Sequence, residues 1–198
     1  MGKLKIFLIF IALLINSALL AYSSDPKEFV GELVNDAIDT LSDKSLSKEE
    51  KAKFVEKMAL ENVDIKALSL YTLGELRKST EKEKINQYQI TFEKYFLKSL
   101  TSRLTDYSDS KFDIIDSEQK SSSYTIVNSK VVPEDGSPEI KIDWRIYTKN
   151  PEKPLIRDLI VEGLSLARTQ KEEFASILSS NDNNIDSLIN KLKEFIEK

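Results

Sequence analysis

Carboxylates are the side chains of this sequence best suited to act as an acid and a base. Asp143 lies between Lys141 and Arg145, and Asp158 and Glu162 fall on one side of a later segment if that segment is extended. The sequence has no histidine and no cysteine, which excludes catalytic triads and zinc sites built from them. Asp143 and Glu162 could form an acid–base pair, but charges on the polar face of a strand are more typical of solvent-exposed ion pairs. We therefore expect no catalytic residue.

Metal-binding and phosphate-binding motifs are absent from the sequence. Asp106, Asp109 and Asp113 are irregularly spaced and do not form an EF-hand loop. Neither GxGxxG nor GxxxxGK followed by Ser or Thr, the glycine-rich motifs that hold phosphate groups, occurs. The net charge is −4 and the isoelectric point is near 5.2, which argues against the basic face of a nucleic-acid-binding protein. We expect no metal, no cofactor and no nucleic-acid partner.

The first half of the chain has the apolar spacing of amphipathic helices. Apolar residues recur every four positions from 29 to 41, and a capping box formed by Ser47 and Glu50 predicts the start of a second helix. Similar boxes predict helix starts at Thr80 and Thr169, and a last amphipathic helix is expected over residues 185–196. The long helix after Thr80 has an unusually aromatic face made of Ile85, Tyr88, Phe92, Tyr95, Phe96, Leu100, Leu104 and Tyr107.

The middle of the chain changes to the alternation of β-strands. Between residues 140 and 146, apolar side chains alternate with charged ones, so one face of this strand is apolar. Further strands are expected at 112–115, 124–133 and 155–161, with an Asp-Gly hairpin turn at 135–136. The order predicts an α+β domain with helices packed on one face of a curved, roughly four-stranded antiparallel sheet. The space between them is either an ordinary core or an apolar cavity, and the pattern does not distinguish the two.

The N-terminus has the features of a signal peptide. Lys3 and Lys5 precede an apolar run at 6–15, and small residues follow in Ala21-Tyr22-Ser23. We expect residues 1–23 to be removed, with cleavage after Ala21 as the alternative, which leaves one exported domain over residues 24–198. An uncleaved anchor is the competing interpretation, but the apolar run is shorter than the about 20 residues that cross a membrane.

One segment resembles a family signature. Residues 157–166, Arg-Asp-Leu-Ile-Val-Glu-Gly-Leu-Ser-Leu, are similar to the D-x-x-x-E-G-V/L-S-hydrophobic signature of the MlaC family, also called the toluene-tolerance auxiliary component of an ABC transport system. The resemblance covers roughly residues 25–193. Other segments agree with the family in order and spacing, namely Trp144-Arg145, residues 169–174 and 185–192, and residues 73–80 with the aromatic helix after them.

The resemblance implies a soluble periplasmic phospholipid carrier. Such a carrier shuttles lipid between an outer-membrane lipoprotein–porin complex and an inner-membrane ABC transporter complex, and so maintains outer-membrane lipid asymmetry. It needs no general acid or base, in agreement with the lack of His and Cys. The alternative is a small-molecule-binding or isomerase-like enzyme on a similar curved-sheet cone, with a buried carboxylate or tyrosine facing the cavity. Nothing in the sequence requires more than a monomer.

The lipid pocket is expected between the sheet and the long helix. The family position implies Leu164 as a pocket residue, and Gly163 before it is expected to bend the backbone at the end of a strand. A cavity for two acyl chains should reach or exceed the top of the usual range of about 300–1,000 Å³. Each further candidate could instead be a core residue that touches no lipid. Strand alternation and the face of the long helix add Ile142, Trp144, Ile146, Ile160, Phe92, Phe96 and Leu100, the last of which stands where the family often has a tyrosine.

Overall fold

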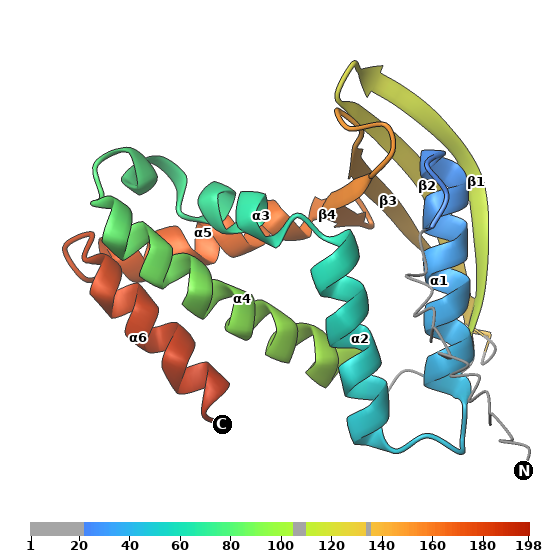
Figure 1. Cartoon of the computed structure of the whole chain (residues 1–198), viewed down its shortest axis with the longest axis horizontal. Coiled ribbons are helices and arrows are strands. Elements are labelled where there is room, and N and C mark those ends of the chain that lie inside the picture. The colour runs from blue at the N-terminus through green and yellow to red at the C-terminus, as the bar shows by residue number, and fades with distance from the viewer. Residues whose placement is uncertain (1–21, 105–109, 134–135) are drawn as a thin grey trace, which may run out of the picture.

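Two lobes lie side by side, one built on an antiparallel sheet and the other made of helices (Figure 1). The computed structural model describes residues 22–104, 110–133 and 136–198. The predicted order of helices, strands and helices is confirmed, and so is the α+β class. The described elements are α1 (Pro26–Ser42), α2 (Lys48–Asn62), α3 (Ile65–Thr72), the 3-10 helix η1 (Gly74–Lys78), α4 (Lys82–Leu104), β1 (Ser110–Ser121), β2 (Tyr124–Pro133), β3 (Ile140–Tyr147), β4 (Leu155–Val161), β5 (Leu164–Ser165), α5 (Leu166–Ser179) and α6 (Ile185–Ile196).

The helix starts follow local hydrogen bonding. The capping box predicted at Ser47 is confirmed, because its side chain accepts the N–H of Glu50 and the Glu50 side chain accepts in return. Helix α4 begins at Lys82, two residues after the start predicted at Thr80. The start predicted at Thr169 is wrong, since Ser165 caps α5 by accepting the N–H of Arg168 at 3.0 Å. Thr169 lies inside that helix, and its hydroxyl donates to the Ser165 carbonyl oxygen.

The sheet is a meander in the order β1-β2-β3-β4-β5, with every neighbouring pair antiparallel. It has one strand more than predicted, the two-residue β5. Strand β1 is also longer than the predicted 112–115, because its polar second half still pairs with β2. Glu162 and Gly163 both have positive φ, 49° and 80°. Two such residues make the turn that joins β4 to β5, which confirms the expected bend at Gly163.

Each lobe has its own hydrophobic core. The first core lies between α1, α2 and one face of the sheet, and includes Phe29, Met58 and Trp144. The second core lies within α3 to α6 and includes Tyr88 and Phe174. Val63, which follows α2, packs against both cores. Figure 1 shows the same division, with α1 along the sheet and α3 to α6 beside it.

Strand β4 contacts the start of α3 through the backbone and one ion pair. The N–H of Asp64 donates to the Ile156 carbonyl oxygen at 2.9 Å, and Val63 forms an isolated parallel bridge with Ile156. The Arg157 guanidinium binds the Asp64 carboxylate through Nε at 2.8 Å and through a second nitrogen at 2.7 Å. The start of α3 is therefore held against the sheet.

The described chain begins at Tyr22, so most of the expected signal peptide lies outside the described residues. The Tyr22 ring packs edge-on against Phe29 at 6.1 Å between centroids, and its hydroxyl donates to Asp36 at 3.0 Å. Burial raises the pKa of the Tyr22 hydroxyl, and the hydrogen bond to Asp36 raises it further, so this group stays a donor at neutral pH. In the described part of the chain, no helix is long and apolar enough to cross a membrane.

The contacts of Tyr22 predict a stability difference between the two expected cleavage products. A chain that starts at Tyr22 keeps the ring contact with Phe29, whereas a chain that starts at Ser24 loses it together with the hydrogen bonds of Ser23 to Glu28 and Glu32. We expect the shorter chain to be less stable by about 1 kcal/mol, or about 2–4 °C in Tm. Thermal unfolding of both chains checks this, and equal Tm values would contradict it.

The first core contains one buried polar bridge. Trp144 Nε1 donates to Ser129 Oγ at 2.9 Å, and Ser129 Oγ donates to the Ile142 carbonyl oxygen at 2.8 Å. Ser129 is 1% exposed, so water cannot replace these bonds without opening the core. The bridge leaves the indole N–H satisfied inside an apolar environment.

Removing this hydroxyl should destabilise the fold. We expect Ser129→Ala to lower the free energy of unfolding by about 1–3 kcal/mol, because the Trp144 N–H is left buried without an acceptor. Urea unfolding can be followed through the fluorescence of Trp144, the single tryptophan of the chain. The matched control is Ser102→Ala on the exposed side of α4, which should change stability by less than about 0.5 kcal/mol. Equal effects of the two substitutions would argue against the bridge.

Candidate functional site

The register of the sheet assembles one continuous apolar face. Trp144 on β3 lies opposite Val127 on β2 and Leu159 on β4, and directly paired residues point to the same side of a sheet. A second line of paired residues crosses all five strands and contains Ser129 as its one polar member. This line consists of Ile114, Ser129, Ile142, Val161 and Leu164.

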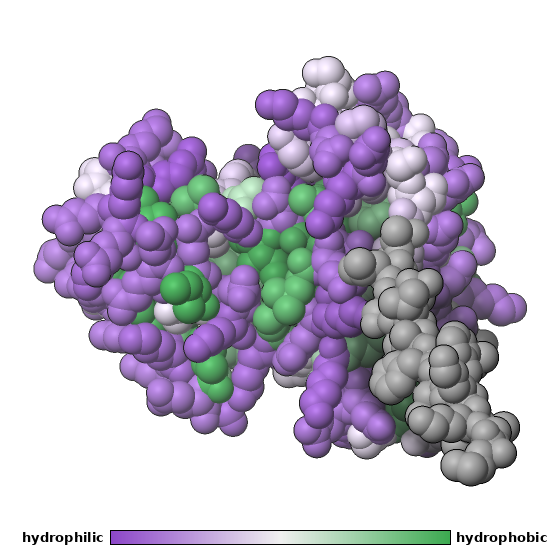
Figure 2. All heavy atoms as spheres, viewed as in Figure 1, coloured by the Kyte–Doolittle hydropathy of each residue, from purple (hydrophilic) through white to green (hydrophobic). Residues whose placement is uncertain are grey.

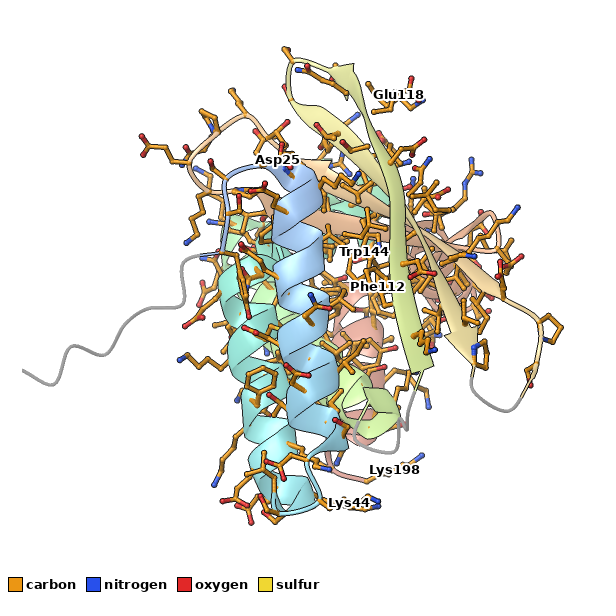
Figure 3. The ribbon with its side chains drawn as sticks, turned by 90° about the vertical axis from the view of Figure 1, so that its right-hand side faces the viewer. Asp25, Lys44, Phe112, Glu118, Trp144 and Lys198 are labelled. Atoms are coloured by element: carbon orange, nitrogen blue, oxygen red, sulfur yellow. The ribbon has the colours of Figure 1, made fainter. Side chains whose placement is uncertain are left out.

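Helices α1 and α2 cover this face unevenly. Ile146 and Val127 are fully buried beneath them. Phe112 and Trp144 pack edge to face at 6.1 Å, and Figure 3 shows both beside α1, next to β1. Toward the edge of the sheet the cover ends, since Ile140 is 38% exposed and Leu164 is 68% exposed. The apolar face therefore runs from a closed core to an open edge.

This face offers almost no unused polar group. The Trp144 indole N–H donates to the Ser129 hydroxyl, which in turn donates to the Ile142 carbonyl oxygen. The charged side chains of β3 point to the opposite side, because they alternate with Ile142, Trp144 and Ile146. A surface of this kind suits alkyl chains, which form no hydrogen bonds.

Four of the predicted pocket residues share this face. Ile142, Trp144 and Ile146 line it from β3, and Leu164 extends it through its pairing with Val161. Ile160 lies on the other side of the sheet, because the register pairs it with Asp143. Sequence reasoning missed Leu159 and Val161, which face the core side of β4. Strand β4 has apolar residues on both of its faces, so its sequence does not show which face is buried. Only the pairing with β3 shows that Leu159 and Val161 face the core.

The predicted residues of the long helix are in the second lobe. Phe92 is 2% exposed and packs against Phe174 at 6.2 Å between ring centroids. Phe96 stacks beside Phe92 and packs against the same core, and Leu100 is half-buried further along α4. The structure thus separates Phe92 and Phe96 from the sheet face. Contact of any of the eight predicted residues with lipid stays a prediction.

The hollow between the lobes is also apolar. Figure 2 shows hydrophobic side chains gathered there, between α2 and the helices of the second lobe. Val63 packs against both cores, and Leu68 and Leu97 are partly buried against the second core. The apolar surface is therefore not confined to the sheet.

Two pockets lie on the polar side of the sheet. One, of about 390 Å³, is lined by residues of β1 to β4 that include Asn128, Asp143 and Ile160. The other, of about 420 Å³, lies between α3, α5 and the sheet and is lined by residues that include Tyr124 and Arg157. Both are smaller and more polar than the cavity expected for two acyl chains.

The acid–base pair considered from the sequence is not assembled. The Glu162 carboxylate accepts the backbone N–H of Lys141 at 2.5 Å, whereas Asp143 lines the 390 Å³ pocket. The buried carboxylate of the site is Asp158, which accepts the Ser165 hydroxyl at 2.6 Å and the Ala167 N–H at 3.0 Å. These bonds give Asp158 a role in holding the start of α5.

Comparison with known proteins agrees with this architecture. No curated protein matches the sequence. A solved structure described as the phospholipid-binding protein from Ralstonia solanacearum, in complex with a phospholipid, matches with a TM-score of 0.71 at 20% sequence identity, over 86% of this chain and 96% of that one. The family model described as MlaC protein matches residues 31–194. The chain therefore belongs to the MlaC family.

Proposed function

We propose that this protein is a periplasmic carrier that binds the acyl chains of a phospholipid on the apolar face of its sheet. Membership of the MlaC family over residues 31–194 is the observation that carries the proposal. The fold shared with a phospholipid-binding protein supports it. In this proposal residues 1–23 direct export and are removed, and the exported domain works as a monomer.

Acyl chains require a large apolar surface and little else. Each buried methylene contributes about 0.8 kcal/mol, so two chains of about fifteen methylenes would cost on the order of 25 kcal/mol to expose to water. The face that runs from Trp144 to Leu164 provides apolar contacts without unpaired donors. The same chemistry explains why a carrier needs no general acid, general base or metal.

We expect lipid uptake to part some of the present contacts. The pockets of about 390 and 420 Å³ are too small and too polar for two acyl chains. The cover of the sheet face is thinnest beside Ile140 and Leu164. We expect the chains to enter at this edge and to displace side chains between the sheet and its covering helices.

The proposed carrier exchanges lipid with membrane complexes at both ends of its path. An inner-membrane ABC transporter complex and an outer-membrane lipoprotein–porin complex are the partners. This role would maintain the lipid asymmetry of the outer membrane. A carrier that covers the alkyl chains with apolar side chains protects the lipid while it crosses an aqueous space.

The proposal predicts bound phospholipid in protein purified without detergent. The chain with its signal peptide is expressed in a Gram-negative bacterium and purified from the periplasm. Native and denaturing mass spectrometry are then compared on one sample. We expect one phospholipid per chain in the native spectrum, released on denaturation. Protein that shows only the bare polypeptide mass would contradict the carrier function.

A substitution at the open edge tests the position of the acyl chains. Leu164→Glu should leave the fold intact, because Leu164 is 68% exposed, and should lower the lipid-bound fraction at least about tenfold, because a carboxylate then meets the alkyl chains. Ile90→Glu is the matched control, since Ile90 is 62% exposed on α4, away from the sheet. A folded Leu164→Glu protein with a full lipid load would place the chains elsewhere.

A further inference from the structure

The 420 Å³ pocket combines an apolar wall with a cationic one. Leu68 and Tyr71 of α3 and Ala167 of α5 line it on one side. Arg145 and Arg157 line it from the sheet, on the face opposite Trp144. Its chemistry therefore differs from that of the apolar sheet face and calls for a different ligand.

A β-bulge places Arg157 in this pocket. The register pairs Arg145 with Asp158 and then Ile146 with Ile156, so Arg157 is an extra residue in β4. Asp158 pairs with Arg145 on the charged face, and Arg157 contacts Tyr147 and Tyr124 on that same face. Two consecutive side chains of β4 therefore point to one side.

Arg157 is held rigidly at the pocket wall. Its guanidinium binds Asp64, donates to the Tyr124 hydroxyl at 2.7 Å and lies 3.5 Å from the centroid of the Tyr147 ring. Burial alone would lower the pKa of Arg157, but its hydrogen bonds to Tyr124 and Asp64 and the charge of Asp64 raise it above its ordinary value. The group is a fixed positive charge. The Tyr124 hydroxyl accepts from it and keeps its own proton to donate.

Arg145 is held more loosely and has donors to spare. Its side chain is 43% exposed, and its ion pair with Asp158 is long, at 3.4 Å. Asp158 already accepts hydrogen bonds from Ser165 and Ala167. A guanidinium carries five N–H donors, so Arg145 can turn some of them toward a ligand without leaving Asp158 unsatisfied.

Lys171 lies near the pocket without lining it. It is one helical turn after Ala167 on α5, and its ammonium is 5.2 Å from the centroid of the Tyr71 ring. The charged residues that line the pocket are Arg145 and Arg157, and each pairs with one carboxylate outside the lining, Asp158 or Asp64.

We propose that this pocket binds a phosphate ester, with Arg145 as the direct ligand of the phosphate and Leu68 and Ala167 against the organic part. Arginine binds phosphate oxygens in a bidentate manner, and the fixed charge of Arg157 and the Tyr124 hydroxyl add to the attraction. A volume of about 420 Å³ is at the lower end of the range for small-molecule sites. It suits a headgroup-sized glycerol phosphate, and the same phosphate chemistry would admit inorganic phosphate.

Calorimetric titration of the exported chain in low-salt buffer tests the site. The probes are glycerol 3-phosphate, inorganic phosphate and uncharged glycerol. We expect glycerol 3-phosphate to bind more tightly than inorganic phosphate, because only the ester contacts the apolar wall, and glycerol not to bind. Equal binding of the two phosphates would overturn the placement of an organic group against Leu68 and Ala167. No binding of either would overturn the proposal.

Matched substitutions locate the binding. Arg145→Gln should weaken glycerol 3-phosphate binding at least about tenfold, whereas Arg103→Gln, an exposed arginine on α4, should not change it. Tyr124→Phe provides a second test that leaves the Arg145–Asp158 pair intact, and it should also weaken binding, because it removes the pocket hydroxyl that contacts Arg157. Unchanged affinity in both pocket variants would overturn the proposal. Lipid content measured by denaturing mass spectrometry should be the same in all variants, so this site can fail independently of the carrier function.

Discussion

The alternation of side chains along β3 and β4 is the constraint on which both proposed sites depend. Trp144 and Ile146 face the helices α1 and α2, and Arg145 between them faces α3 and α5. Because the period of a strand is two residues, a register slip of one residue would exchange the apolar and charged faces. The hydrophobic pattern makes such a slip costly, since it would bury charges and expose a tryptophan. The bulge at Arg157 departs from this alternation and places an extra arginine on the charged face.

The fold class could be predicted because its elements have strong local patterns. The alternation over residues 140–146 and the aromatic spacing after Thr80 each specify one kind of element. The second half of β1 could not be predicted, because its polar sequence forms a strand only through pairing with β2. The start of α5 at Leu166 depends on Ser165 and on the buried carboxylate of Asp158, which comes from a neighbouring strand. Tertiary contacts decided these boundaries, and local propensity did not.

The same distinction applies to the candidate site. Ile142, Trp144 and Ile146 could be grouped on one face, since strand alternation alone requires it. Phe92 and Phe96 have the spacing of a buried stripe, but spacing does not say which core the stripe joins. Helices α5 and α6 supply enough apolar surface to bury it in the second lobe. The arginine pocket was missed because its residues come from three strands and two helices, and the bulge that places Arg157 there leaves no signal in the sequence.

One carboxylate links the two lobes at the start of α3. The Oδ1 atom of Asp64 accepts the N–H of Ala67 and so caps α3, while Oδ2 binds Arg157 of β4. One oxygen thus contacts the helical lobe and the other contacts the sheet. The backbone hydrogen bond from the Asp64 N–H to the Ile156 carbonyl oxygen lies beside them. Both charged side chains are largely buried, so removing either would leave the other without its partner, which costs more than the pair itself contributes. The start of α3 therefore cannot move away from β4 without breaking this ion pair.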